Sequence, residues 1–345
     1  MKKKKAKKAI LLIVVAILLS IVIFFNFGNI CLLIKGYGLN ELKKLNSVLS
    51  YSQLIQISKN DYCDNIELII DDDNFCADNA VEYFNYISNN SVNDDIKTAI
   101  KIVNYGIDYP YSQKLATIVN DPYYINDLID RYINYDCQDY QQIVQSVNCS
   151  IDYPYYTNTK PADLSKQQLV LVNKYNYLDP NYVPDDLVSV DLYHSYSGNS
   201  LERVALDNYI EMHSAALNDG IQLILFSGYR TYQLQNELWT TRSESKGIEY
   251  ADEYTARAGY SEHQTGLALD ITRYDSDDIQ QAYDWLENNS YKFGFILRYP
   301  KDKENITGYS YEPWHFRYVG TQVAYQIYQE GITFDEYYAY YIADR

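Results

Sequence analysis

The sequence has few cysteines, few histidines and, after its first eight residues, few basic residues. It holds 5 Cys and 4 His in 345 residues. No two cysteines form a Cys-x-x-Cys pair, which argues against a zinc site built on thiolates. Six of the 29 Lys and Arg residues stand among the first eight positions, which leaves 23 against 46 Asp and Glu in the remainder. A body this acidic repels a phosphate backbone, so we expect no nucleic-acid partner.

Several catalytic motifs are absent as well. The chain has neither the His-Glu-x-x-His of many zinc proteases nor the Gly-x-Ser-x-Gly of serine hydrolases. Residues 243–246 match the Ser-x-x-Lys of penicillin-binding enzymes, but no Lys-Thr-Gly accompanies them. They also stand among polar residues at the end of a predicted helix. We therefore do not expect a serine nucleophile.

The amino terminus combines a lysine cluster with a long uncharged stretch. Residues 9–25 carry no charge, and the uncharged stretch reaches Ile34. About 20 apolar residues cross the hydrocarbon core of a membrane, and lysines hold their side in the cytoplasm. We predict a cytoplasmic basic tail at 1–8 and a transmembrane anchor at 9–34, with the rest of the chain outside the cell membrane. A removed signal peptide is less favoured, because no small-residue cleavage site follows.

The character of the sequence changes near residue 160. Residues 35–160 are predicted to form short helices, for example at 39–49, 79–87 and 96–103, and to serve as a spacer or docking module. Residues 161–345 are predicted to form the catalytic domain. Its expected helices lie at 201–217, 231–242, 277–288 and 321–329, and its expected strands at 169–172, 221–226, 267–271, 293–297 and 314–319. The predicted fold class is α+β, with a small mixed or antiparallel sheet and flanking helices.

Four of the cysteines fall within residues 35–160. The simplest pairing joins near neighbours, Cys63 with Cys76 and Cys137 with Cys149. The alternative is that these cysteines are free, buried thiols. The spacing alone leaves both possibilities open.

Two of the four histidines stand beside acidic residues in the second half of the chain. His263 precedes Asp270 by seven positions, and His315 follows Glu312 by three. Two imidazoles and a carboxylate are a suitable donor set for zinc, and a catalytic zinc keeps one position open for water. Side chains seven apart on a straight strand point to opposite faces, so we expect a bend at Gly266 between His263 and Asp270.

Glu312 is the expected general base of such a site. Pro313 prevents a regular helix between Glu312 and His315, so one side chain can bind metal while the other reaches the attacking water. Glu262 adjoins His263 and is the second choice for the base. It ranks below Glu312 because alternation along an extended chain would turn it away from a metal on His263. The other two histidines, at positions 194 and 213, have no partner at ligand spacing, and we expect them to be surface or helix residues.

The stretches around these residues resemble the VanY-type D-alanyl-D-alanine carboxypeptidases, which are zinc peptidases of bacterial peptidoglycan. The resemblance covers about residues 165–332. It is carried by residues 171–174, 182–187, Ser227-Gly228-Tyr229-Arg230 with Gln235, Ser261-Glu262-His263-Gln264-Thr265-Gly266 with Asp270, and Glu312-Pro313-Trp314-His315. Their joint occurrence in one order is specific to the family.

The resemblance implies a metal centre and its ligands. It implies one Zn²⁺ per chain, held by His263, Asp270 and His315, with Glu312 as the base. Arg230 would polarise the scissile carbonyl or hold the terminal carboxylate of the substrate, since its fixed fork of donors suits either task.

The resemblance also implies the substrate, the peptidoglycan stem peptide. Ser261 and Gln235 would grip its terminal D-alanine, and the implied reaction removes that residue. An L,D-carboxypeptidase or an endopeptidase of the same fold is the alternative. A non-catalytic, zinc-containing module that binds the cell wall is the alternative outside the enzymes, and it would have no use for the unligated Glu312. The sequence does not indicate an oligomeric state.

Overall fold

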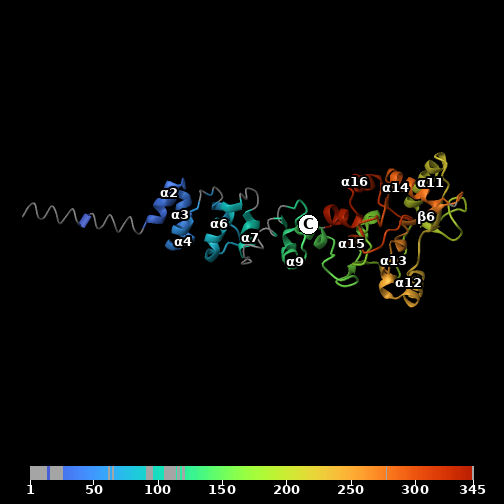
Figure 1. The fold of residues 1–345 in the computed structure, drawn as a ribbon, viewed down its shortest axis with the longest axis horizontal. Coiled ribbons are helices and arrows are strands. Elements are labelled where there is room, and N and C mark those ends of the chain that lie inside the picture. The colour runs from blue at the N-terminus through green and yellow to red at the C-terminus, as the bar shows by residue number, and fades with distance from the viewer. Residues whose placement is uncertain are drawn as a thin grey trace, which may run out of the picture. The chain divides into compact units, whose positions relative to one another are not determined.

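The structure is a computed structural model, and it describes residues 14–15, 26–60, 63, 66–90, 96–104, 114, 117–118, 121–276 and 278–343. The chain divides into two compact units, residues 1–126 and residues 127–345 (Figure 1). The second unit therefore begins well before residue 161, where the catalytic domain was predicted to start. The functions predicted for residues 35–160 and 161–345 stay predictions.

The described part of the first unit consists of short helices. They are α2 (Phe27–Ile34), α3 (Leu39–Val48), α4 (Tyr51–Ile57), α5 (Ile66–Ile70), the 3-10 helix η1 (Ala77–Asn79), α6 (Ala80–Asn90) and α7 (Ile96–Asn104). Ser50 begins α4 with a capping box, in which its hydroxyl accepts from the Gln53 amide and the Gln53 side chain accepts from the Ser50 amide. The apolar faces of these helices share one core, which contains Leu45, Ile57 and Ile66.

The prediction of a transmembrane helix at 9–34 is wrong. No helix among the described residues is long and apolar enough to cross a membrane. The last part of the predicted span forms α2, whose Leu32 is fully buried in the core of the first unit. A Cβ on Gly28 would lie 3.2 Å from the Leu54 Cβ, so α2 packs closely against α4. Leu32 thus packs against protein, whereas Phe27, Leu33 and Ile34 of the same helix are exposed. Residues 1–13 and 16–25 lie outside the described residues.

The cysteines are not paired as their spacing suggested. All five are described, and all five are free thiols. Cys63 and Cys149 are buried, which is common for a cysteine that packs as a small apolar residue. The structure therefore corresponds to the alternative of free thiols.

The second unit is built around a four-stranded sheet. Its helices are α9 (Ile129–Asn134), α10 (Ile143–Asn148), α11 (Arg203–Asn218), α12 (Tyr232–Lys246), α13 (Ile248–Tyr254), α14 (Ile279–Asn289), α15 (Glu304–Thr307), α16 (Thr321–Glu330) and α17 (Phe334–Tyr337). Its strands are β1 (Lys160–Pro161), β2 (Asn176–Tyr177), β3 (Leu187–Ser189), β4 (Ser200–Glu202), β5 (Leu223–Ser227), β6 (Ala268–Arg273), β7 (Phe295–Leu297) and β8 (His315–Tyr318). The main sheet has the order β5-β6-β8-β7, and all its pairs are antiparallel. A small sheet with flanking helices is thus present, as the sequence predicts.

The strand predicted at 169–172 does not form. Residues 164–169 form a 3-10 helix, and the buried Val170 and Val172 lie outside any strand. The carbonyl of Val170 instead accepts a hydrogen bond of 2.8 Å from the Arg317 guanidinium, which also donates to the carbonyl of Gln168. A buried arginine side chain therefore satisfies backbone groups that a neighbouring strand would otherwise satisfy.

The two faces of the main sheet have different roles. Leu269 on β6 and Phe316 on β8 point into the apolar core, which α11 and α14 cover next to β5 and β6 (Figure 1). Successive strand residues point to opposite faces, so Asp270 and His315 lie on the other face. The same alternation places Arg317 on that polar face, where it is fully buried. The sheet therefore presents charged and imidazole side chains together on one side.

Candidate active site

His263 lies on a short 3-10 helix (Glu262–Thr265) immediately before β6. The Ser261 hydroxyl caps this helix and accepts a hydrogen bond of 3.3 Å from the His263 amide. Gly266 ends it in the left-handed conformation at φ 70°, which glycine adopts at little cost. A Cβ at this position would lie 3.0 Å from the Glu202 amide nitrogen. The expected bend at Gly266 is therefore present, and it lies between His263 and Asp270.

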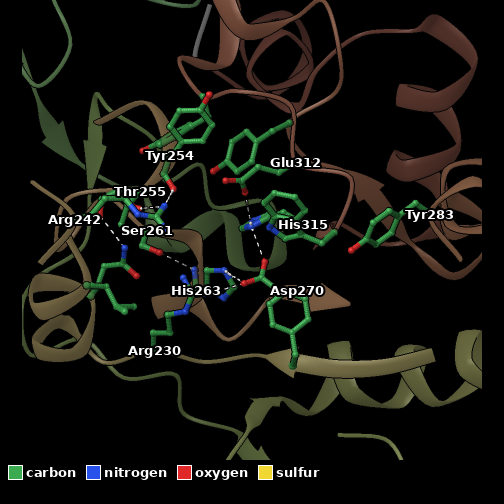
Figure 2. Close-up of a pocket in the computed structure, with 17 residues that line it drawn as sticks. Arg230, Arg242, Tyr254, Thr255, Ser261, His263, Asp270, Tyr283, Glu312 and His315 are labelled. Atoms are coloured by element: carbon green, nitrogen blue, oxygen red, sulfur yellow. Dashed lines mark hydrogen bonds and ion pairs between the residues drawn. The ribbon is translucent and has the colours of Figure 1, made fainter. Parts of the chain in front are cut away.

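Asp270 and His315 are brought together by the register of two strands. They face each other across the antiparallel pair β6–β8, with a distance of 3.1 Å between Asp270 Oδ1 and His315 Nδ1. His263 approaches from the 3-10 helix and places its Nε2 at 3.3 Å from Asp270 Oδ2. All three side chains are buried, and one ligand atom of each lies within 4.8 Å of the others. Figure 2 shows Asp270 between the two imidazoles.

The donor atoms of this cluster fit a metal ion. His263 Nδ1 lies 2.7 Å from the Gly228 carbonyl, so this nitrogen carries the ring proton and Nε2 is left with a lone pair. Within the described part of the chain, Asp270 Oδ1 has no hydrogen-bond partner although it is buried beside His315 Nδ1. A buried carboxylate oxygen without a hydrogen-bond partner is stabilised by a cation, and imidazole nitrogens beside it can share that cation. His263, Asp270 and His315 therefore can hold a metal ion.

Glu312 stands beside the cluster as an additional carboxylate. Its Oε2 lies 3.6 Å from His315 Nδ1, at the end of the turn in which the His315 amide donates to the Glu312 carbonyl. Burial raises the pKa of Glu312 from 4.5 to about 7, against the opposing effect of His315. A carboxyl with a pKa near neutrality is suited to exchange protons during a reaction.

The other titratable groups of the cluster differ in protonation. Burial and the nearby Arg230 lower the pKa of His263 to about 4, which keeps this imidazole neutral. Burial acts to lower the pKa of His315 too, but the neighbouring carboxylates of Asp270 and Glu262 raise it to about 9. Burial opposes ionisation of Asp270, yet His263 and His315 hold its pKa well below the usual range. Asp270 is therefore ionised and ready to bind a cation.

Replacing Glu312 by Gln is expected to stabilise the metal-free protein at about pH 8 and to have little effect at about pH 4. Because the Glu312 pKa is raised to about 7, the native state retains a proton that the unfolded chain releases above pH 4.5. The stability contributed by the protonated carboxyl is fully present below pH 4.5 and is lost as the pH rises through 7. Thermal melts of both proteins in a chelator across this range measure the effect. Identical pH dependences would contradict it.

Arg230 follows β5 and contacts the group of His263, Asp270 and His315 directly. These three residues are called the metal cluster below. Its Nε donates to the Ser227 hydroxyl at 2.8 Å, and its Nη2 donates to Asp270 Oδ2 at 2.5 Å. Its own amide donates to the His263 carbonyl at 3.1 Å. The guanidinium is thus fixed at the edge of the cluster, and both it and the ligands line one pocket.

Ser261 and Gln235 also line this pocket. Gln235, on α12, is 1% exposed and donates from Nε2 to the Ala256 carbonyl at 2.8 Å. Its Oε1 finds no hydrogen-bond partner among the residues that the structure describes. An unused buried acceptor in a pocket wall can receive an N–H group of a bound substrate.

The pocket has a volume of about 450 Å³ and opens beside the metal cluster (Figure 2). Several lining residues were not identified from the sequence, namely Phe226, Leu238, Arg242, Tyr254, Thr255, Ala256, Tyr283, Tyr299, Tyr309 and Trp314. Arg242 is held on the wall by hydrogen bonds to the Tyr254 carbonyl and the Thr255 hydroxyl. The chain contains 40 Tyr, which could have pointed to an aromatic pocket, but this number does not distinguish the tyrosines of the pocket from the others.

Glu262, the second choice for the base, forms ion pairs with two buried arginines. Its Oε1 accepts hydrogen bonds of 2.8 Å from Arg298 Nε and 3.0 Å from Arg317 Nη1. Sequence reasoning missed both arginines. Arg317 lies inside a predicted buried strand. A buried cation requires a carboxylate partner, so this arginine could have been used to predict one.

The two remaining histidines form a separate pair. The rings of His194 and His213 lie 4.7 Å apart, and His194 Nδ1 contacts Asp191 at 2.8 Å. His213 is fully buried in α11. The aspartate partner of His194 stands only three residues before it and was overlooked in the sequence. Neither histidine belongs to the metal cluster.

The chain is similar to known peptidases. A family model described as VanY, D-alanyl-D-alanine carboxypeptidase, matches residues 198–321. A D-alanyl-D-alanine carboxypeptidase of Enterococcus faecalis is 38% identical over 195 residues, which cover 52% of this chain and 69% of the relative. The bifunctional D-Ala-D-Ala dipeptidase and D-Ala-D-Ala carboxypeptidase VanXYC of Enterococcus gallinarum is 36% identical over 181 residues, which cover 50% of this chain and 94% of the relative. A solved structure of a D,D-pentapeptidase VanY with Zn(II) is 36% identical, covers 49% of this chain and 98% of its own, and has a TM-score of 0.46.

The matched region contains the complete cluster. It begins before Arg230 and ends after His315, and it includes the 3-10 helix, β6 and β8 that position the ligands. Both curated relatives align over more than two thirds of their own length. The chain therefore belongs to the VanY D-alanyl-D-alanine carboxypeptidase family.

Proposed function

We propose that the protein is a zinc carboxypeptidase that removes the C-terminal D-alanine from peptidoglycan stem peptides. The observation that carries this proposal is the convergence of His263, Asp270 and His315 in one buried cluster, with Glu312 beside it and a pocket in front of it. Family membership supports the substrate class. Because peptidoglycan lies outside the cytoplasm, the proposal places the catalytic unit there.

One zinc ion would be held by His263 Nε2, by the Asp270 carboxylate and by His315 Nδ1, which are the atoms that face one another. When bound, zinc acts as a Lewis acid that polarises a carbonyl and makes water more acidic. Two neutral imidazoles and one carboxylate are a usual set for catalytic zinc. The low pKa of His263 favours the neutral form that a ligand requires.

Glu312 serves as the general base and acid. It takes a proton from the attacking water and then delivers it to the leaving amine of D-alanine. Its position 3.6 Å from His315 Nδ1 keeps it close to the cluster without a place among the three ligands. Its pKa of about 7 permits both transfers near neutral pH.

Arg230, Ser261 and Gln235 orient the substrate in the pocket. Arg230 is fixed by Ser227 and Asp270, so its remaining N–H groups stay in one place as negative charge develops on the scissile carbonyl oxygen. Gln235 Oε1 accepts an N–H of the substrate, and the Ser261 hydroxyl donates to its terminal carboxylate. This arrangement uses donors and acceptors that are already on the pocket wall.

Defined stem peptides test the proposed function. The zinc-loaded protein is incubated with tripeptide, tetrapeptide and pentapeptide stems and with cross-linked stems, and the products are identified by mass spectrometry. We expect loss of one D-alanine from the pentapeptide. Cleavage of the tetrapeptide alone would indicate an L,D-carboxypeptidase, cleavage of cross-linked stems alone an endopeptidase, and no cleavage at all the non-catalytic wall-binding module.

A further inference from the structure

Two buried polar atoms face each other behind the metal cluster. Glu262 Oε2 and His315 Nε2 lie 3.8 Å apart, and their side chains are 0% and 6% exposed. In the part of the chain that the structure describes, neither atom has a hydrogen-bond partner. Two buried polar atoms without partners are unfavourable, and a proton on the ring nitrogen that points at the carboxylate oxygen lowers their free energy.

The orientation of Glu262 is fixed from the other side. Arg298 Nε and Arg317 Nη1 both donate to Oε1, at 2.8 and 3.0 Å, which keeps Glu262 ionised and prevents its rotation. Oε2 is thereby held toward His315. Arg298 is in turn anchored by Asp335 on α17, at 2.6 Å, and Asp335 also accepts from the Asn173 side chain at 2.8 Å.

The imidazole of His315 presents its other nitrogen to the cluster. Nδ1 lies 3.1 Å from Asp270 Oδ1, so this nitrogen must keep its lone pair to bind a metal, and Nε2 must carry the proton. His263 has the opposite arrangement, since its Nδ1 faces the Gly228 carbonyl and its Nε2 faces the cluster. Gly228 thus selects the tautomer of one ligand, and the other ligand requires an equivalent acceptor.

We propose that Glu262 is this acceptor, a positioning residue whose Oε2 accepts a hydrogen bond from the Nε2–H of His315 and so fixes its tautomer and ring orientation. The inference rests on the zinc site proposed above and assigns a task to a carboxylate that is neither ligand nor base. Carboxylates behind metal-bound histidines typically change metal affinity by about 10–100-fold when they are replaced.

Zinc affinity measured by competition with a chromophoric chelator tests the assignment. Glu262→Gln keeps the shape of the side chain, but with its oxygen on the arginines it turns an NH₂ donor toward His315 Nε2 and favours the wrong tautomer. We expect zinc affinity to fall about 10–100-fold in the full-length variant. Asp335→Asn is the matched control, because it removes a carboxylate from the same arginine network without facing His315. Both variants should melt earlier, but only Glu262→Gln should lose zinc affinity.

Equal losses of zinc affinity in the two variants would overturn the proposal, since they would reduce Glu262 to a structural partner of Arg298. A second measurement does not require the variant to fold. In the ¹⁵N-histidine NMR spectrum of the zinc-loaded wild type, we expect His315 to be protonated at Nε2 and His263 at Nδ1. Protonation of His315 at Nδ1 would overturn the proposal. A wild-type protein that binds no zinc would overturn the proposed function itself, whereas zinc binding that is unaffected by Glu262→Gln overturns this inference alone.

Discussion

Glu312→Gln is expected to lower kcat on D-alanine-terminated stems by about 10²–10⁴-fold while zinc binding is retained. The amide has nearly the size and shape of the carboxyl, but it cannot take a proton from the attacking water. Glu312 lies beside the three predicted ligands without being one of them, so its replacement leaves the donor set complete. Because the base acts in the transition state, KM should change much less than kcat.

The control for this variant is Glu249→Gln on α13, which removes an exposed carboxylate outside the pocket lining. It should turn over stems at the wild-type rate. If Glu312→Gln also kept the wild-type rate with zinc in place, the assignment of the base would fail. Glu262 would be a poor replacement, because Arg298 and Arg317 both donate to its Oε1 and stabilise its ionised form.

His263→Ala and His315→Ala are each expected to abolish binding of the single zinc ion and, with it, all measurable hydrolysis. Each substitution removes one of three buried donors and leaves a two-ligand site, which is too few for a catalytic zinc. Metal content after dialysis gives the stoichiometry directly. Circular dichroism shows whether the sheet persists.

His194→Ala provides the comparison, because it also removes a histidine but lies outside the cluster. This variant should retain one zinc per chain. Full zinc retention in both His263→Ala and His315→Ala would refute the ligand assignment, whatever their activity.

The sheet and the metal cluster were accessible from the sequence because their signals are local. The sequence at 267–271 and 314–319 predicted β6 and β8, and the expected bend at Gly266 follows from the conformational freedom of glycine. The 3-10 helix before this bend was not predicted. The residues that line up as ligands are also unusual, since the chain has only 4 histidines. Local pattern was sufficient to predict the two strands that carry Asp270 and His315.

The remaining features depend on contacts between distant parts of the chain. The run at 169–172 is apolar enough for a strand, but its Val170 carbonyl accepts a hydrogen bond from the Arg317 guanidinium, as does the preceding Gln168 carbonyl. Leu32 on α2 is equally suited to lipid and to a protein core, and only the fold shows that it is buried in the core of the first unit. The partners of Glu262 come from two different strand regions, and no spacing rule relates them to it. Sequence patterns report what a residue can bury, whereas the identity of its partner is a property of the whole fold.

The cross-strand pairing of Asp270 with His315 has a consequence for how the protein acquires its activity. Side chains alternate along a strand, so a slip of β8 by one residue would turn His315 into the apolar layer and bring Phe316 to the polar face. Such a misaligned sheet would bury much of the same apolar surface, but it would lack a ligand. Metal binding therefore requires the correct alignment of β6 and β8, and a chain that folds with these strands in the wrong register has no metal-dependent activity.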